Sequence, residues 1–167
     1  MFHDFTLAEF RKLYPNDDAC LEEIKEIRYP DGVLCRECKT VTQHYKIAGR
    51  TAYGCRFCRN QIYPLTGTVF EKSTTPLTKW FYALFLMTQT RSRISIQGLQ
   101  GELGVTYKTA WRMYGLIKRL MEQKDGDLLR EPSALIKFQD KKTGDKIYKW
   151  VLFNAIEVRV VHRSESS

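Results

Sequence analysis

Four of the five cysteines in this 167-residue chain form two closely spaced pairs. Cys35 and Cys38 make one C-x-x-C turn, and Cys55 and Cys58 make a second turn after sixteen intervening residues. Each such turn directs two thiolates toward a common point, and two turns complete a closed tetrahedron around Zn²⁺ that leaves no position for a substrate. The spacing therefore predicts a structural zinc site with these four cysteines as ligands.

Two disulfides or a redox-active C-x-x-C motif are the alternatives to zinc. Disulfides need an oxidising compartment, whereas the N-terminus MFHDFTLAEF lacks the basic and apolar regions of a secretory signal. A redox motif needs only one pair of cysteines. We therefore expect Zn²⁺ as the cofactor, in a structural role.

The segment around the cysteines is typical of a zinc ribbon, a few strands whose folding free energy comes largely from the bound metal. Residues 43–48 and 50–54 are expected to form strands around a turn at Gly49. Residues 61–63 and 68–70 are expected to form further strands.

Two short helices are expected before the ribbon. Thr6 and Glu9 have the spacing of a capping box, and Asn16 can cap the second helix. Cys20 shares a helical face with Ile24, so we interpret it as a core residue rather than a fifth ligand. The three histidines are scattered along the chain, and none is assigned as a ligand.

A longer helix is expected after the ribbon. Thr75 offers a capping hydroxyl, and Pro76 suits the first helical position. Five apolar residues and one threonine follow with a 3.6-residue period, which predicts a buried stripe. These residues are Leu77, Trp80, Phe81, Leu84, Phe85 and Thr88.

The next segment has the order helix, glycine turn, helix, which is typical of a DNA-binding helix-turn-helix. Ser95 can cap the first of these helices, with Ile96, Leu99 and Leu103 directed inward. Gly104 permits a sharp turn. In the turn Val105 fills the interior, and Thr106 can cap the second helix.

The second helix, residues 106–121, is predicted to read DNA. Its expected buried stripe consists of Ala110, Met113, Ile117 and Leu120, and its opposite face is basic. Residues near the N-terminal end of such a helix contact base edges, and later ones contact phosphates. The candidate base-contacting residues are Tyr107, Lys108, Thr109 and Arg112. The candidate phosphate-contacting residues are Lys118 and Arg119.

The net charge of +8 is concentrated in the middle of the chain. Residues 35–70 carry 6 basic and 1 acidic side chains and residues 71–124 carry 9 and 3, whereas residues 1–34 carry 4 and 8. This distribution favours a polyanionic partner for the middle segments. We therefore expect the ribbon and the helix-turn-helix to lie side by side and to present one surface to duplex DNA. The ribbon's candidate DNA contacts are Arg36, Lys46, Arg50, Arg56 and Arg59.

Several motifs go beyond a generic zinc ribbon. They are DDACLEEIKEIRYPDGVLC before the cysteines, TGT at 66–68, PLTKWF at 76–81 and GVTYKTAWRM at 104–113. With them the chain closely resembles, over about residues 5–130, the N-terminal region of insertion-sequence transposases of the ISXO-like group. The resemblance implies a zinc ribbon before a helix-turn-helix, recognition of the element's terminal repeats, and a following ribonuclease H-like core with an acidic triad.

The chain departs from that family beyond Glu131, where 36 residues follow and no Asp-Glu-Thr signature is found. Two-metal phosphoryl transfer requires several converging carboxylates, so we expect no catalytic residues here. Residues 134–138, 147–153 and 156–161 are instead expected to form an antiparallel meander. Self-association or a partner chain through these strands would cover its apolar face.

The expected fold class is α+β. We expect an N-terminal helical segment (1–33), a zinc ribbon (34–72), a helix-turn-helix domain (73–131) and a β-rich tail (132–167). The expected function is zinc-dependent, sequence-specific binding of double-stranded DNA, like the end-recognition part of a transposase truncated before its catalytic core.

Two alternatives remain open. The chain could be a fragment of an active DNA-cutting transposase, or a protein-interaction module or regulator built on a zinc ribbon. The longest apolar run has eight residues (80–87), far below the roughly 20 that cross a bilayer. We therefore expect no membrane partner and a cytoplasmic, nucleoid-associated location.

Overall fold

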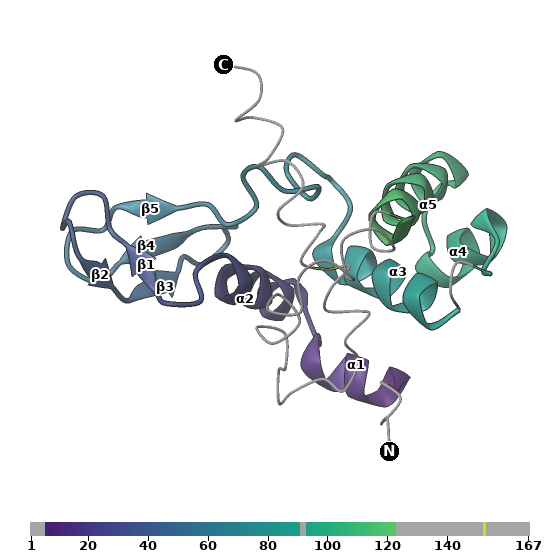
Figure 1. The fold of residues 1–167 in the computed structure, drawn as a ribbon, viewed down its shortest axis with the longest axis horizontal. Coiled ribbons are helices and arrows are strands. Elements are labelled where there is room, and N and C mark those ends of the chain that lie inside the picture. The colour runs from purple at the N-terminus through teal and green to yellow at the C-terminus, as the bar shows by residue number, and fades with distance from the viewer. Residues whose placement is uncertain (1–5, 91–92, 123–151, 153–167) are drawn as a thin grey trace.

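The computed structural model describes residues 6–90, 93–122 and Leu152. In chain order, two helices precede five short strands, and three helices follow them (Figure 1). The described part of the chain is therefore α+β, as the sequence predicts. The expected meander lies outside the described residues except at Leu152, which is helical and fully buried rather than part of a strand.

The two N-terminal helices begin where the sequence predicts. Before α1 (Leu7–Leu13), the Thr6 hydroxyl accepts a hydrogen bond from the Glu9 backbone N–H, and the Glu9 carboxylate accepts one from the Thr6 N–H. Before α2 (Asp17–Arg28), the Asn16 side chain accepts from a backbone N–H in the first turn. These bonds satisfy N–H groups that have no partner within the helix, which fixes both start points.

Five strands form the ribbon. β1 (Val33–Leu34) pairs antiparallel with β2 (Val41–Thr42). β3 (His44–Lys46), β4 (Tyr53–Cys55) and β5 (Gln61–Ile62) form an antiparallel sheet in that order. The hairpin and the third strand of this sheet confirm the predicted strands, whereas the β1–β2 hairpin was not predicted.

The turn between β3 and β4 contains Gly49, which has a φ of 70°. This left-handed conformation strains a residue with a side chain, so a glycine suits the position. The predicted turn at Gly49 is confirmed.

Residues 68–70 form a turn and not the predicted strand. Thr68 has a β-branched side chain, but its hydroxyl donates to the Leu65 carbonyl at 2.7 Å and accepts from the Phe70 N–H at 3.2 Å. Local bonds between side chain and backbone thus replace strand pairing. Gly67 also has a φ of 81°, which turns the chain just before this point.

Helix α3 (Leu77–Gln89) carries the predicted buried stripe, and all six of its members are buried. Its cap differs from the prediction. Pro76 is the N-cap residue, and no side chain at that position caps the helix. The carboxylate of Asp17 in α2 instead accepts from both the backbone N–H and the hydroxyl of Thr78, each at 2.9 Å.

The predicted helix-turn-helix is formed by α4 (Ile96–Leu103) and α5 (Tyr107–Glu122). Ser95 caps α4 through the Gly98 N–H at 3.0 Å. Gly104 is left-handed (φ 61°, ψ 42°) and ends α4, as predicted. The Thr106 hydroxyl accepts from the Thr109 N–H at the start of α5, which confirms the second cap.

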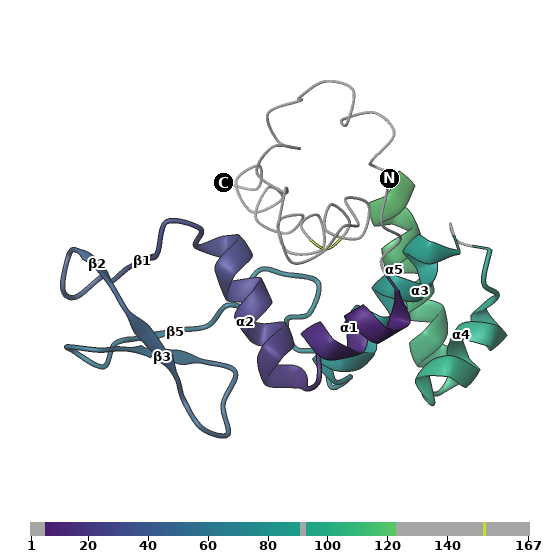
Figure 2. The same ribbon diagram turned by 90° about the horizontal axis from the view of Figure 1, so that it is seen from below.

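The ribbon and the helix-turn-helix do not lie side by side. In both ribbon views the strands lie at one end of the long axis and α4 and α5 lie at the other, with α2 and α3 between them (Figures 1 and 2). Leu21 and Ile24 of α2 share one hydrophobic core with Trp80, Phe81 and Leu84 of α3. This helical core lies between the two elements, so the ribbon and the helix-turn-helix are not adjacent as expected.

Two contacts near the C-terminal end of α2 attach it to the ribbon. The ammonium of Lys25 lies 4.5 Å from the centre of the Tyr53 ring. Arg28, at the end of α2, donates from Nη1 to the carbonyl oxygens of Pro64 and Thr66, each at 2.6 Å. The TGT motif at 66–68 is therefore part of the joint between ribbon and helices. None of the described helices is long and apolar enough to cross a membrane.

Candidate metal centre and nucleic-acid interface

The two C-x-x-C pairs lie in turns of the same construction. The first turn connects β1 to β2: Cys35 donates its N–H to the Thr40 carbonyl at 3.0 Å, and Lys39 donates to the Cys35 carbonyl at 2.9 Å. A φ of 56° at Lys39 reverses the chain directly after the second cysteine of the pair.

The second turn connects β4 to β5 and repeats this pattern. Cys55 donates to the Asn60 carbonyl at 2.9 Å, Arg59 donates to the Cys55 carbonyl at 3.2 Å, and Arg59 has a φ of 65°. A left-handed non-glycine residue is uncommon. Its recurrence at equivalent positions shows that both turns hold their cysteines in one specific geometry.

These turns bring the four predicted ligands together. All four sulfur atoms lie within 4.8 Å of one another. The Sγ atoms of Cys35 and Cys58 are 3.4 Å apart, and those of Cys38 and Cys55 are 3.9 Å apart. A tetrahedron with metal–sulfur bonds of about 2.3 Å has sulfur atoms about 3.8 Å apart. The cluster therefore has the donor set and the size of a four-thiolate metal site.

The four cysteines are free thiols, as is Cys20, which is buried in the helical core and is not a member of the cluster. His44 is buried close to the cysteines, with Nδ1 3.1 Å from the Thr42 carbonyl oxygen, but it is not a member of the cluster. That Cys20 and His44 are not ligands stays a prediction.

Thr42 contacts the cluster directly, a role that the sequence analysis missed. Its hydroxyl lies 3.2 Å from the Cys55 sulfur, and this hydrogen bond lowers the pKa of the Cys55 thiol to about 5. The pKa of Cys38 is instead raised to about 12, chiefly through its hydrogen bond with Cys58. Since only thiolates bind metal, the hydrogen bond from Thr42 favours the metal-binding form of Cys55.

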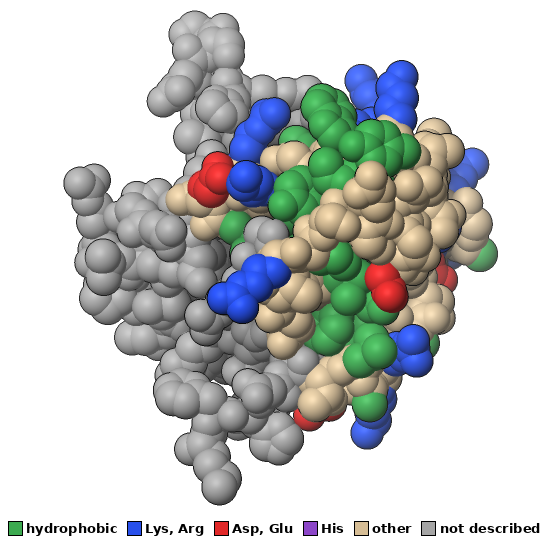
Figure 3. Space-filling model, turned by 90° about the vertical axis from the view of Figure 1, so that its right-hand side faces the viewer, with side chains coloured by type: hydrophobic (Ala, Val, Ile, Leu, Met, Phe, Trp, Pro, Cys, Tyr) green, Lys and Arg blue, Asp and Glu red, His purple; other side chains and the backbone are tan. Residues whose placement is uncertain are grey.

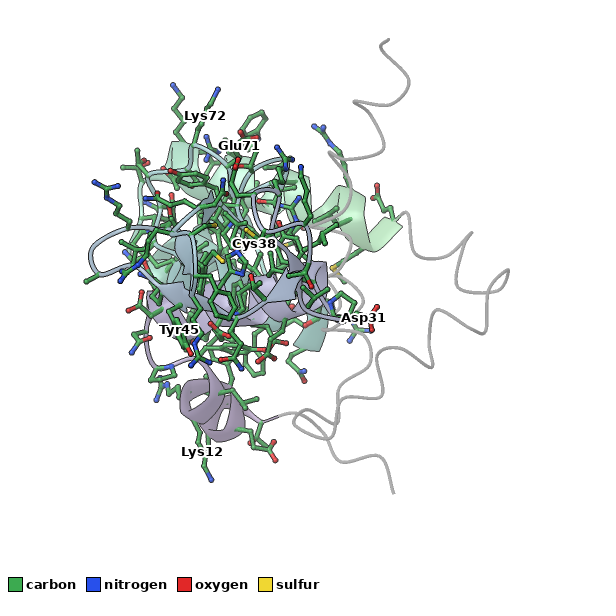
Figure 4. The ribbon with its side chains drawn as sticks, turned by 90° about the vertical axis from the view of Figure 1, so that its left-hand side faces the viewer. Lys12, Asp31, Cys38, Tyr45, Glu71 and Lys72 are labelled. Atoms are coloured by element: carbon green, nitrogen blue, oxygen red, sulfur yellow. The ribbon has the colours of Figure 1, made fainter. Side chains whose placement is uncertain are left out.

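Four of the ribbon's five candidate DNA contacts are exposed: Arg36, Arg50, Arg56 and Arg59. Arg36 and Arg56 directly follow the first cysteine of their turns. The guanidinium of Arg56 lies 5.8 Å from the centre of the Phe57 ring, which is 71% exposed. Figure 4 looks onto this end of the molecule, with Cys38 near its centre and Tyr45 toward its margin.

Lys46 is placed differently from those arginines. Its ammonium donates to the carbonyl oxygens of Ile47 and Arg50, at 2.9 and 2.6 Å, and lies 3.3 Å from the Asp18 carboxylate. These bonds give Lys46 a structural role, because they close the β3–β4 turn and connect it to α2. A DNA contact by Lys46 would compete with them.

Helix α5 has the two faces that the sequence predicts. Ala110, Met113, Ile117 and Leu120 are all buried. The candidate contacts Lys108, Arg112, Lys118 and Arg119 are exposed, and Tyr107 is 48% exposed. Thr109 is half-buried, and its hydroxyl lies 2.9 Å from that of Thr106 in the cap.

Trp111 was assigned no role from the sequence, yet it is 60% exposed on α5. The signal for it was present, because position 111 lies outside the helical period of the buried stripe. Figure 3 looks at this end of the molecule and shows hydrophobic side chains in a band on the surface, with Lys and Arg side chains around it. The exposed surface of α5 is thus both cationic and aromatic.

Comparisons with known proteins give two matches. Residues 15–61 match the family model of the transposase zinc-ribbon domain. An uncharacterized protein in transposable element ISH50 of Halobacterium salinarum is 34% identical over 105 residues, which is 60% of this chain and 34% of that protein. The chain spans about a third of the length of this relative. No solved structure matches the chain.

The family match covers α2 and the four cysteines, and the similarity to the ISH50 protein is longer than the ribbon alone. Together they confirm that the chain resembles the N-terminal region of insertion-sequence transposases.

Proposed function

We propose that this chain is a zinc-dependent, sequence-specific DNA-binding protein that recognises the ends of a transposable element. The proposal rests chiefly on one combination: a four-cysteine cluster within a transposase-type ribbon, followed by a helix-turn-helix whose second helix has an exposed cationic face. The ribbon and the helix-turn-helix, residues 34–72 and 73–131, are proposed as two separate DNA-contacting units.

Zn²⁺ is the metal that this donor set favours, since four thiolates in tetrahedral arrangement are typical of structural zinc. Cys35, Cys38, Cys55 and Cys58 would hold it. With all four positions filled by sulfur, the metal would stabilise the fold of the ribbon and would not activate water. The ribbon's strands have only two or three residues each, which supports a large metal contribution to its folding.

On this proposal α5 lies in the major groove. Tyr107, Lys108 and Arg112 near its N-terminal end would contact base edges, and Thr109 would contribute its half-buried side chain. The candidate phosphate contacts farther along the helix are Lys118 and Arg119. Their exposure and the left-handed turn at Gly104, which sets the angle between α4 and α5, support this docking.

The ribbon would contact a second stretch of the same duplex. Its four exposed arginines belong to the turns of the ribbon, whose strands lie at the opposite end of the molecule from α5 (Figure 1). A footprint in two separated parts therefore fits the proposal better than one continuous footprint. The candidate ribbon contacts are Arg36, Arg50, Arg56 and Arg59.

Recognition is the role we assign to the described residues. Among these residues the four cysteines are the one group of three or more side chains that could hold a metal ion. A converging set of carboxylates, which two-metal DNA cleavage requires, is absent from that part of the chain. Cutting and joining of DNA by a longer protein that contains this sequence would thus use other residues.

Selection of duplexes from a random pool by the zinc-loaded protein tests the proposal. We expect one defined motif, whose affinity falls with salt at a slope near −5 in log K against log salt if about six phosphates are neutralised. The control is the protein from which a chelator has removed the metal, and it should select no motif. The alternative function, a protein-interaction module, predicts that the chain binds no duplex. A complex with a protein whose affinity does not depend on salt would favour this alternative.

A further inference from the structure

Tyr107, Trp111, Gly115 and Arg119 are each four residues apart on α5, so they form one row along the helix surface. Trp111 is 60% exposed, and the next position in the row has no side chain at all. The row therefore has an apolar projection followed by a gap. We call Trp111 and Gly115 together the α5 notch.

The protein's own packing does not explain the glycine at position 115. A Cβ atom added there would meet no heavy atom of residues 6–90, 93–122 or Leu152 within 4 Å, and the φ of Gly115 is not positive. Gly98 in α4 differs in this respect, because a Cβ there would lie 3.1 Å from the Ile94 side chain. Glycine inside a helix is unfavourable relative to alanine. Among the described residues nothing occupies the space beside Gly115, so a group from a partner could approach the helix backbone there.

The charges around the notch indicate what enters. Lys108 and Arg112 lie within one turn of Trp111, and Lys118 and Arg119 lie within one turn of Gly115. All four are exposed, and the one ion pair on this helix that the structure describes joins Lys118 to Glu122 at 3.9 Å. A partner that fits this surface would combine dense negative charge with a small apolar group at one point.

Duplex DNA has this combination in its major groove. The phosphates flank the groove, and the apolar group that its base edges present is the C5-methyl of thymine. Insertion of an aromatic wedge between base pairs is instead characteristic of proteins that bind the minor groove. A helix in the major groove would thus bring the Trp111 indole against a methyl group and not into the base stack.

We propose that the α5 notch receives the C5-methyl group of a thymine, with Trp111 as its wall and Gly115 as the gap that permits close approach. Trp111 is thereby a specificity-determining residue in addition to the cationic ones. This inference rests on the proposed DNA-binding function and makes one position of the recognised motif a thymine.

Uracil substitution tests the contact between Trp111 and the thymine methyl group. Each thymine of the selected duplex is replaced in turn by uracil, which keeps the base pairing and removes only the methyl group. For the wild-type protein we expect about a fourfold loss of affinity at one position, the equivalent of burying a single carbon group. Trp111→Ala should bind more weakly and should not distinguish thymine from uracil at that position.

Gly115→Ala tests the gap, and its two effects should have opposite signs. The added methyl should raise the unfolding temperature, because alanine favours a helix, and should lower DNA affinity severalfold, because it fills the notch. Gly101→Ala is the matched control: Gly101 lies in α4, and a Cβ there also meets no atom within 4 Å. It should raise the unfolding temperature and leave DNA affinity unchanged.

The outcomes separate the two proposals. If the wild-type protein binds the selected duplex but tolerates uracil at every position, or if Gly115→Ala binds as tightly as wild type, the notch proposal is wrong while the DNA-binding function stands. If the wild-type protein selects and binds no duplex, the DNA-binding function and the notch fail together.

Discussion

The carboxylate of Asp17, in the first turn of α2, accepts hydrogen bonds from the backbone N–H and the hydroxyl of Thr78, in the first turn of α3, each at 2.9 Å. The two residues are 61 positions apart. One acidic side chain thus caps a distant helix and fixes where α2 meets it. Since α2 also contacts the ribbon, this bond helps to set the position of the ribbon relative to the helix-turn-helix.

Asp17→Ala should lower the free energy of unfolding by about 1 kcal/mol, the usual cost of removing a helix N-cap. The loss arises because the Thr78 N–H has no partner of its own at the start of α3. Urea unfolding of the zinc-loaded protein measures it.

Asp18→Ala is the matched control for this substitution. Asp18 lies in the same turn of α2 but pairs with Lys46 at 3.3 Å through a side chain that is 72% exposed. Exposed ion pairs contribute little to stability, so this variant should lose less than Asp17→Ala. Equal losses in the two variants would contradict the capping role of Asp17.

Features that depend on neighbouring residues were predictable from the sequence. The capping box at Thr6, the cap at Asn16 and the left-handed turn at Gly104 each need only a few adjacent residues. The four-cysteine cluster was also predictable, although its two pairs are farther apart in sequence, because two C-x-x-C turns at this spacing typically bind one metal ion. The buried faces of α3 and α5 followed from the 3.6-residue period.

Features that depend on distant residues were not predictable in this way. Thr75 has the residue type of a cap, but the Asp17 carboxylate occupies that role. Lys46 has the charge of a DNA contact, but Asp18 and two carbonyl groups hold its ammonium. Thr68 has the propensity of a strand residue, but its hydroxyl bonds to the local backbone. In each case a distant partner or a local hydrogen bond, rather than the residue type alone, determined the structural role of the residue.

Thr42→Val should weaken metal binding by about 10- to 100-fold, the range expected when a hydrogen bond to a metal ligand is removed. The Thr42 hydroxyl lowers the pKa of the Cys55 thiol to about 5, so its loss raises that pKa and lets protons compete better with the metal. Competition titration with a chromophoric chelator measures the affinity.

The same variant should release its metal at a higher pH than the wild-type protein. A lowered pKa favours the thiolate at pH values above it, and this advantage is lost as the pH falls through about 5. Thr40→Val is the control, because the Thr40 side chain is exposed and only its backbone carbonyl supports the turn. An acid midpoint that is the same in all three proteins would show that Thr42 does not assist the cluster.

Cys55→Ser should reduce the bound zinc from one per chain to well below one and unfold the ribbon, because strands this short cannot fold by packing alone. Elemental analysis gives the stoichiometry, and amide hydrogen exchange of residues 33–62 reports the unfolding. Cys20→Ala is the control: burial raises the pKa of its thiol well above the usual range, and it lies outside the cluster. It should keep full zinc, and a Cys55→Ser protein that also does so would refute the metal assignment.

Arg28→Ala should loosen the joint between the ribbon and the helices. Its guanidinium donates to the Pro64 and Thr66 carbonyl groups, and charged hydrogen bonds of this kind contribute about 1.5–3 kcal/mol each. Limited proteolysis should therefore cut residues 64–72 faster than in the wild-type protein. Arg11→Ala, on the exposed surface of α1, is the control and should leave the cleavage rate unchanged.

Arg112→Ala and Lys118→Ala should weaken DNA binding in different ways. Arg112 lies near the N-terminal end of α5, where base contacts are expected, so its loss should cost about 1–3 kcal/mol on the selected duplex and relax the preference at one base pair. Lys118 lies two turns farther along the helix. Its loss should weaken binding to selected and random duplexes alike and should reduce the slope of log K against log salt by about 1. Equal losses for Arg112→Ala on selected and random DNA would remove Arg112 from the base-contacting set and assign it to the phosphates.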